Sequence, residues 1–265
     1  AVLLRHANIV QLFELGKSEN QYYIAMEYVA GMDLRRIVAW FRAHKKMMPV
    51  PLAAFICAKI CEGLDYAHKK LNVHGSASNF VHGGLSPQNV FVSFDGQVKV
   101  SDFGIAKAAH HLAATHAGIL KGKIAYMSPE QGGGHAFDRR SDVFSCGALL
   151  HEMLTGHCLF EAESQVATFK KVMECEIPRM GERNAGIPAG LEHVVRTALA
   201  KDPNERYQWS HDFAEALKPF WLEDKTPFDS VMLAAFMNEA FRDDIEGELQ
   251  RCKAFSSMTE ADAVG

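Results

Sequence analysis

The chain has 265 residues, of which 48% are hydrophobic and 23% are charged, the balance of an ordinary globular protein. A chain of this length buries enough surface to be stable without disulfide or metal cross-links, and its net charge of −4 excludes a strongly basic nucleic-acid-binding domain. The charge is uneven: residues 1–222 carry 24 basic and 22 acidic side chains, whereas residues 223–265 carry 4 and 10. The acidic excess therefore lies in the last segment.

Six cysteines are scattered without the spacing of a disulfide framework. Cys57 and Cys61 lie four residues apart on a predicted helix and could form half of a metal site, but no second pair follows at ligand spacing. We therefore expect buried free thiols and a reducing, cytoplasmic location. No apolar run reaches the ~18 residues of a membrane span, so we expect no membrane segment in this chain.

The first third of the chain predicts a hairpin followed by two helices. Residues 10–15 and 21–28 are β-prone runs on either side of a polar turn. Residues 32–44 predict a short helix, and residues 51–70 a longer one with Pro51 in its first turn. The apolar stripe of the longer helix has three- and four-residue spacing and consists of Leu52, Phe55, Ile56, Ile60, Leu64 and Ala67.

The clearest local signal is a second hairpin. Residues 90–94 and 98–100 are β-prone runs around Asp95-Gly96, a pair that supplies the positive φ angles of a two-residue turn. Residues 106–134 show no sustained period and predict a loop.

After that loop the chain is mostly helical. Ser141 is expected to cap a helix that ends at Gly156, and residues 164–207 predict helices interrupted by proline and glycine. A short β-rich front and a helical body predict an α+β fold, without the alternating βα units of a Rossmann-type sheet.

The acidic last segment predicts one further helix. Ser230 can cap it, and its apolar stripe runs at four-residue spacing through Leu233, Met237, Phe241, Ile245 and Leu249. We expect this stripe to dock onto the helical body; the alternative is a surface for a partner helix. Residues 255–265 are expected to be disordered.

Two polar residues flank the second hairpin, Asn89 before it and Asp102 after it. Because a tight hairpin brings its two ends together, these side chains should lie close to each other. A carboxylate and an amide oxygen that face one space can hold Mg²⁺ bound to phosphate. The structural alternative is that Asn89 caps a turn and Asp102 ends a strand.

The motifs around these residues resemble the eukaryotic-type protein kinases, specifically the serine/threonine kinases of bacteria. The stretch from His82 to Asn89 is similar to the catalytic-loop pattern H-R-D-L-x-x-x-N, and Asp102-Phe103-Gly104 to D-F-G. Met127-Ser128-Pro129-Glu130 resembles the A-P-E motif. Four further segments follow in the family's order, namely residues 4–10, 23–29, 138–156 and 201–206.

This resemblance implies a protein-kinase-like fold in three parts. Residues 1–29 would be a remnant of the N-lobe with the hinge strand, and residues 30–222 the mainly helical C-lobe. Residues 223–265 would add an acidic helix and a disordered tail.

The resemblance also implies ATP and Mg²⁺ as cofactors and a protein as substrate. The implied nucleotide-binding positions are Met26, Glu27, Val29, Asp33, Asn89 and Asp102. Asn89 and Asp102 would be the metal ligands. The main chain of Glu27 and Val29 would pair with adenine, Met26 would lie at the back of the pocket, and Asp33 would approach the ribose.

Three more positions have structural roles by the same resemblance. Glu130 and Arg206 match a buried ion pair that holds the substrate-binding region, and Asp142 would anchor the catalytic loop through backbone N–H groups. Removing one member of a buried ion pair costs roughly 3–5 kcal/mol of stability.

The catalytic loop departs from the family pattern. Gly84 occupies the position of the catalytic aspartate and Gly83 that of the preceding arginine. Gly84 has no side chain that could orient a substrate hydroxyl or accept its proton, and loss of general-base assistance typically costs ~10²–10⁴-fold in rate. Ser86 stands where many serine/threonine kinases carry a lysine beside the transferring phosphate.

The stretch between Asp102 and Met127 contains a candidate phosphosite, because Thr115 is its single serine or threonine. With Gly83 in place of the arginine, the loop offers no partner for a phosphate there. His110, His111 and His116 lie in the same stretch; a metal site is one interpretation, and solvated loop histidines are the expectation.

The sequence as given contains no G-x-G-x-x-G, and only twenty-odd residues precede the hinge. We therefore expect half of the ATP cradle to be missing and nucleotide binding to be weak or absent, unless a longer chain supplies these parts. His82-Gly83 is also similar to the H-G-D of aminoglycoside and choline kinases, but Ser128-Pro129-Glu130 and the segment 202–206 favour protein kinases.

Two functional hypotheses remain open. One is a serine/threonine protein kinase homologue with impaired or absent phosphotransfer. In this hypothesis no catalytic residue is intact, because Gly84 occupies the position of the catalytic aspartate. The other is a pseudokinase that acts as a scaffold or partner-binding module through its C-lobe and tail helix.

Overall fold

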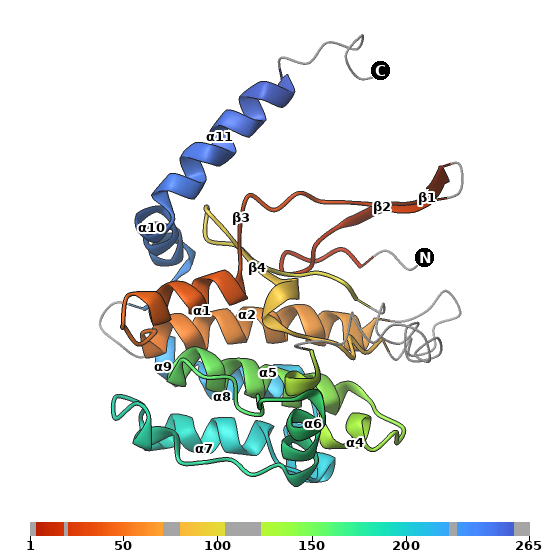
Figure 1. The fold of residues 1–265 in the computed structure, drawn as a ribbon, viewed down its shortest axis with the longest axis vertical. Helices are drawn as coiled ribbons and strands as arrows, with labels where there is room; N and C mark the ends of the chain where they lie inside the picture. The colour runs from red at the N-terminus through yellow and green to blue at the C-terminus, as the bar shows by residue number, and fades with distance from the viewer. Residues whose placement is uncertain (1–3, 19–20, 71–79, 104–122, 223–226, 257–265) are drawn as a thin grey trace.

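Two small antiparallel sheets lie above a helical body (Figure 1). The computed structural model describes residues 4–18, 21–70, 80–103, 123–222 and 227–256. In the first sheet, β1 (Leu12–Ser18) pairs with β2 (Gln21–Met26), as the sequence predicts. The second sheet has the order β3-β4-β5, with β3 (Gly31–Asp33), β4 (Val90–Ser93) and β5 (Val98–Val100).

The β4–β5 hairpin confirms the Asp-Gly turn, and Gly96 has the expected positive φ of 82°. Strand β3 was not predicted, because two of its three residues, Met32 and Asp33, were assigned to the start of the following helix. Gly31 pairs there with Ser93 so closely that a Cβ would lie 2.1 Å from the carbonyl oxygen of Val92. A strand of three residues is too short to show an alternating pattern in the sequence, and this one forms because it pairs with the distant strand β4.

The helical body is built around two long helices, α2 (Val50–Lys69) and α5 (Arg139–Thr155). Every residue of α5 from Ser141 to Thr155 is buried, which explains why this helix shows no amphipathic period. The shorter helices around them are α1 (Leu34–Ala43), α4 (Pro129–Gly132), α6 (Gln165–Glu174), α7 (Ala189–Ala198), α8 (Ser210–Leu217) and α9 (Pro219–Leu222). Single 3₁₀ turns occur at Pro87–Asn89, Ile124–Tyr126, Met180–Glu182 and Pro203–Glu205.

The five cysteines whose side chains the structure describes are free thiols, as expected. Cys57, Cys61 and Cys146 are fully buried between α2 and α5, and Cys158 and Cys175 are half-buried. Within the described ranges, no group of three or more histidine, cysteine or acidic side chains is arranged to hold a metal ion. The same ranges contain no helix with the length and apolar character needed to cross a membrane. His110, His111, His116 and Thr115 lie outside the described residues.

Two predicted helix caps are wrong. Helix α5 is capped by Asp138, whose Oδ1 accepts from the Arg140 N–H at 2.9 Å, rather than by Ser141. Likewise Asp229, not Ser230, caps the tail helix, through the N–H of Met232 at 2.9 Å. In both cases an aspartate just upstream competes with the serine, and its carboxylate makes the stronger charge-assisted bond. The predicted C-terminal Gly156 is confirmed, with a φ of 72°.

The tail forms two helices instead of one, α10 (Ser230–Ala240) and α11 (Arg242–Ser256). Leu233, Met237 and Phe241 are buried in the main core, so the docking prediction holds as far as Phe241. Beyond the break the stripe fails, because Leu249 is 56% exposed. Helix α11 extends two residues into the segment expected to be disordered; residues 257–265 lie outside the described ranges.

Candidate functional site

A buried carboxylate holds the loop from His82 to Asn89 in place. Asp142 on α5 accepts the backbone N–H groups of His82 and Gly83, each at 2.9 Å, and pairs with His68 Nε2 at 2.7 Å. Burial alone would raise the pKa of Asp142, but these donors and His68 hold the pKa below its usual value. Asp142 thus remains an anion that fixes the loop. His68 was not anticipated, since nothing in a helical histidine reveals a partner 74 residues away.

The His82 side chain continues this anchoring. Its Nδ1 accepts the N–H of Gly84 at 3.2 Å, and its Nε2 lies 2.9 Å from the carbonyl oxygen of Ser101. An acceptor at Nδ1 requires the proton to reside on Nε2, so the ring is neutral. Burial lowers the pKa of His82, in agreement with this state. The ring also contacts Phe103, with centroids 4.9 Å apart.

The two predicted metal ligands lie at adjoining ends of the β4–β5 hairpin. The N–H of Ser101, next to Asp102, donates to the carbonyl oxygen of Asn89 at 2.8 Å. Asn89 is buried, and its side chain ties the loop by accepting from Ser86 N at 2.8 Å and donating to the carbonyl of Gly84 at 2.9 Å. Asp102 is exposed, in the left-handed region with a φ of 64°.

These donors fit a hard cation. The amide oxygen of Asn89 keeps a second lone pair after its bond to Ser86, and Asp102 adds an exposed carboxylate. Backbone in the left-handed region costs energy for a non-glycine residue and is enriched at functional sites. Asn89 also fulfils the structural alternative, because its side chain holds a turn.

At position 84 the main chain is ordered but carries no side chain. The N–H of Gly84 donates to His82 Nδ1, and its carbonyl accepts from Asn89. The adjacent Gly83 has a φ of 70°, and its carbonyl accepts from Gln131 Nε2 at 2.8 Å. Gln131 was not singled out from sequence, since its partner lies 48 residues away. Hydrogen bonds therefore fix the main chain of the loop at Gly83 and Gly84, although position 84 has no functional side chain.

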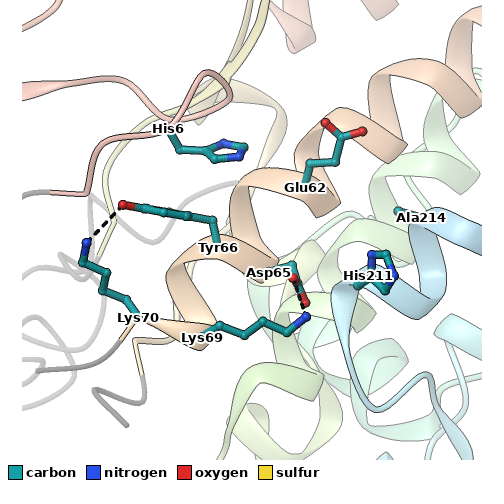
Figure 2. A pocket seen from close by; sticks show the side chains of 8 residues that line it. All are labelled: His6, Glu62, Asp65, Tyr66, Lys69, Lys70, His211 and Ala214. Atoms are coloured by element: carbon teal, nitrogen blue, oxygen red, sulfur yellow. Dashed lines mark hydrogen bonds and ion pairs between the residues drawn. The ribbon is translucent and has the colours of Figure 1, made fainter. Parts of the chain in front are cut away.

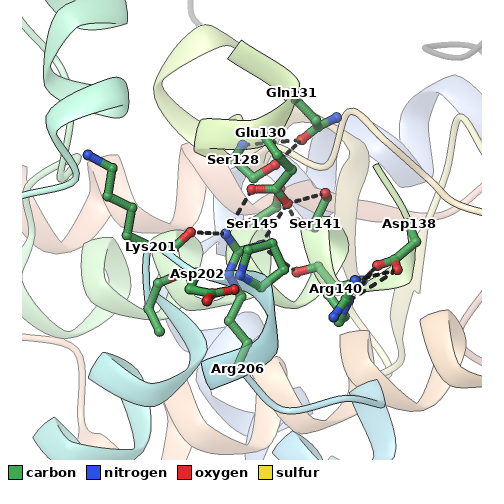
Figure 3. A network of polar contacts seen from close by, with 12 residues as sticks. Ser128, Glu130, Gln131, Asp138, Arg140, Ser141, Ser145, Lys201, Asp202 and Arg206 are labelled. Atoms are coloured by element: carbon green, nitrogen blue, oxygen red, sulfur yellow. Dashed lines mark hydrogen bonds and ion pairs between the residues drawn. The ribbon is translucent and has the colours of Figure 1, made fainter. Parts of the chain in front are cut away.

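Figure 3 shows the polar network around Glu130 and Arg206. Arg206 makes a two-pronged ion pair with Glu130, at 2.7 and 2.8 Å, and its side chain has no exposed surface. The guanidinium also donates to the carbonyl oxygens of Ala200, Lys201 and Arg140. Burial would raise the pKa of Glu130, but Arg206 and the Ser141 hydroxyl hold it below its usual value. The structure thus joins the two residues that the sequence paired.

The predicted adenine-binding strand is partly committed to other contacts. The N–H of Glu27 donates to the carbonyl of Gln11 at 2.7 Å, so this N–H is already paired within the chain. The Glu27 carboxylate pairs with Lys99 at 2.9 Å. Met26 is 44% exposed rather than enclosed, and Val29 is half-buried.

Asp33 stands at the start of α1, where the sequence placed it near the ribose. Its carboxylate accepts the N–H of Arg36 at 2.8 Å, so one oxygen caps the helix. Arg35 lies 3.7 Å from the second oxygen. Asp33 therefore has a structural role in addition to any contact with a nucleotide.

A groove of about 370 Å³ opens beside the catalytic loop at Ser86, Pro87 and Gln88. One wall is fixed by Glu152, which accepts from Arg42 at 2.6 Å and from the Tyr126 hydroxyl at 2.5 Å. The buried Ser86 hydroxyl has no partner within the described part of the chain. Its O–H group is therefore an available donor within the loop.

A second cavity, of about 450 Å³, lies away from these elements (Figure 2). It is lined by His6, Glu62, Asp65, Tyr66, Lys69, Lys70, His211 and Ala214. The lysines already have partners, since Lys69 pairs with Asp65 at 2.8 Å and Lys70 donates to the Tyr66 hydroxyl at 3.1 Å. This cavity contains none of the predicted site residues.

The comparisons with known proteins agree with this geometry. The protein kinase domain model matches residues 2–222. The chain is 36% identical over 259 residues to the tyrosine-protein kinase MasK of Myxococcus xanthus, covering 98% of this chain and 40% of MasK. It is 33% identical over 222 residues to the serine/threonine-protein kinase PrkC of Bacillus subtilis, covering 84% of this chain and 32% of PrkC.

A solved structure gives the same fold. The PknI kinase domain of Mycobacterium tuberculosis superposes with a TM-score of 0.61 at 24% identity, covering 81% of this chain and 72% of that domain. The chain spans about a third to two fifths of the length of the two curated relatives. With the kinase-domain match over residues 2–222 and a helical lobe below small sheets, the chain belongs to the bacterial eukaryotic-type protein kinase family.

Proposed function

We propose that this chain is a protein kinase homologue in which phosphoryl transfer to a protein hydroxyl is impaired at the general-base step. The observation that carries the proposal is Gly84. Asp142, Asn89 and Gln131 hold the loop around it, yet the residue that would meet the substrate hydroxyl has no side chain. Serine or threonine is the expected acceptor, and tyrosine is assayed beside it because one relative is named a tyrosine kinase.

The cofactors in this proposal are ATP and Mg²⁺, and the residues fit them only in part. Asn89 Oδ1 and the Asp102 carboxylate would hold the metal, and the carbonyl of Glu27 and the main chain of Val29 would meet adenine. The bound nucleotide supplies the transferable phosphoryl group. Because both side-chain contacts act through the metal, residual binding should be weak and Mg²⁺-dependent.

Restoring the missing carboxylate tests the proposal. We expect Gly84→Asp to raise the phosphotransfer rate by ~10²–10⁴-fold, the typical contribution of a general base. The matched control is Gly84→Asn, which has the same size and cannot accept a proton. The assay uses Mg-ATP with serine, threonine and tyrosine peptides.

Either of two results contradicts this assignment. A wild-type turnover near one per second, as in ordinary kinases, means that phosphotransfer is not impaired. Equal rates for Gly84→Asp and Gly84→Asn mean that the base is not the missing part.

A binding role is the second candidate, because the frame of the loop is kept although the base is absent. In such a pseudokinase the helical lobe would recognise a partner protein. The tail stripe is poorly suited to this task in the present conformation, since Leu233, Met237 and Phe241 are buried against the body. Capture of a partner that is lost in Leu249→Ala, a change at an exposed position of the tail that should leave thermal stability intact, supports binding through the tail.

The setting proposed for either role is cytoplasmic, and the free, buried thiols of Cys57, Cys61 and Cys146 support it. A chain with a net charge of −4 gives no reason to propose a nucleic-acid partner.

A further inference from the structure

The tail is fastened to the body through α10. The ring of Phe236 stacks on Phe41 at 5.2 Å and meets Trp40 edge-on at 5.5 Å. On the same helix, Asn238 Nδ2 donates to the carbonyl oxygen of Phe94 at 3.0 Å. Helix α10 is thus held both by α1 and by the end of strand β4.

From this base α11 rises on the side of the molecule that carries the sheets (Figure 1). Two bonds tie it to the chain between the end of β2 and the first turn of α1. The Tyr28 hydroxyl donates to Glu248 Oε1 at 2.5 Å, and Arg36 Nη2 donates to Asp244 Oδ1 at 2.6 Å. These partners lie 220 and 208 residues apart in sequence. They bracket residues 28–36.

The bracketed segment is the hinge. Tyr28 stands between Glu27 and Val29, the two main-chain positions proposed for adenine, and Arg36 lies in the first turn of α1. The backbone N–H of Arg36 donates to the carboxylate of Asp33, the residue that caps α1. Helix α11 therefore contacts the hinge near both of its ends.

The upper contact joins the buried Glu248 to Tyr28, which is 69% exposed. Glu248 is 8% exposed, and its second oxygen accepts from Arg251 at 2.5 Å. A buried carboxylate must be matched by donors, and Tyr28 and Arg251 supply two of them. The lower pair is more open to solvent, with side-chain exposures of 51% for Arg36 and 35% for Asp244, and should contribute less.

We propose that α10 and α11, residues 230–251, form an intramolecular strap that holds the hinge through the contacts at Tyr28 and Arg36. While α11 is seated, the strap restrains residues 26–33; when α11 is lifted, the hinge becomes mobile and its main chain loses a fixed geometry. This restraint does not require nucleotide binding. Its consequence for adenine rests on the proposed function.

Hydrogen–deuterium exchange of the full chain tests the strap, with residues 22–33 as the reporting segment. Tyr28→Phe removes the donor to Glu248 and keeps the ring, and Asp244→Asn removes the charge that faces Arg36. We expect hinge amides to exchange about fivefold faster in Tyr28→Phe, and more in the double variant, because exchange reports local opening. Exchange in the buried helix α5 should not change.

The matched control is Asp243→Asn, the same charge change one residue away at an exposed position. It should leave hinge exchange at the wild-type rate. Hinge exchange within twofold of wild type in the double variant overturns the proposal. So does an equal acceleration in α5, which means general loss of stability, or an equal effect of Asp243→Asn. Because no nucleotide is added, failure of the proposed ATP site leaves this test intact.

Discussion

The buried side of the catalytic loop and its open side are equipped very differently. On the buried side, Asp142 and Gln131 bind the loop's main chain, and His68 completes the contacts of Asp142. On the open side, Gly84 has no side chain and Asp102 is exposed. The difference teaches that the loop takes its shape from the buried polar contacts below it. We call these contacts the frame; it comprises Asp142, His68 and Gln131 together with the Glu130–Arg206 ion pair. A catalytic group can therefore be absent from this position while the fold is kept.

The largest effect is expected where the frame itself is broken. Arg206→Ala removes the buried member of the pair and leaves the Glu130 carboxylate, which is 12% exposed, without its cation, so the free energy of unfolding should fall by about 3–5 kcal/mol. Urea denaturation measures the change. Arg35→Ala is the control, because the Arg35 side chain is 62% exposed, and it should change stability by less than ~0.5 kcal/mol. Similar losses for the two variants would contradict a special role of the frame.

The tail extends the comparison, since it too has a buried and an open part. Leu233→Ala removes a side chain with no exposed surface and should cost about 2–5 kcal/mol. The same change at Leu249, which is 56% exposed, should cost almost nothing. Thermal and urea unfolding of both variants compare them directly. A near-zero cost at Leu233 would mean that α10 is not packed in solution.

Acid should lower the stability of the folded chain through His151, which is buried within α5. Burial lowers the pKa of His151 to about 4, whereas the unfolded value is near 6.5. Between these values the unfolded chain takes up a proton that the folded chain does not, so stability falls as the pH is lowered. His151 alone should account for roughly 2 kcal/mol between pH 7.5 and pH 5.

Urea denaturation at the two pH values, for wild type and His151→Gln, checks this effect. The variant should lose less stability on acidification than the wild type, whatever its stability at pH 7.5. An identical loss in both proteins would assign the acid sensitivity to other groups.

The smallest effect is expected on the open side. Asp102→Asn keeps a residue that tolerates the left-handed backbone and removes the charge, so stability should change by less than ~0.5 kcal/mol. Any Mg²⁺-dependent thermal stabilisation by ATP should disappear. If Asp102→Asn costs as much stability as Arg206→Ala, the open side belongs to the frame and the comparison fails.

The elements that could be predicted from sequence are those with local signals. The Asp95-Gly96 turn, the stripe of α2 and the motif positions depend on neighbours in the chain, and the structure contains each element where it was expected. Helix α5 was placed correctly, but its start was not, because a helix buried on all sides has no period that marks its boundary.

The missing parts depend on distant contacts. Strand β3 exists because Gly31 can approach β4, and His68 matters because α2 lies against α5. The division of the tail at Phe241 and the contact between Glu248 and Tyr28 likewise follow from docking. No window of the sequence contains both partners of such a contact.

The glycine at the β4–β5 turn has a consequence for the evolution of the tail. A Cβ at Gly96 would lie 2.0 Å from the carbonyl oxygen of Ser230 and 3.0 Å from the amide nitrogen of Ala234, so the first turn of α10 rests directly on this turn's backbone. A side chain at position 96 and this placement of α10 exclude each other. A homologue that acquires any other residue at this turn must move its C-terminal helix, and a lineage that keeps the helix here must keep the glycine.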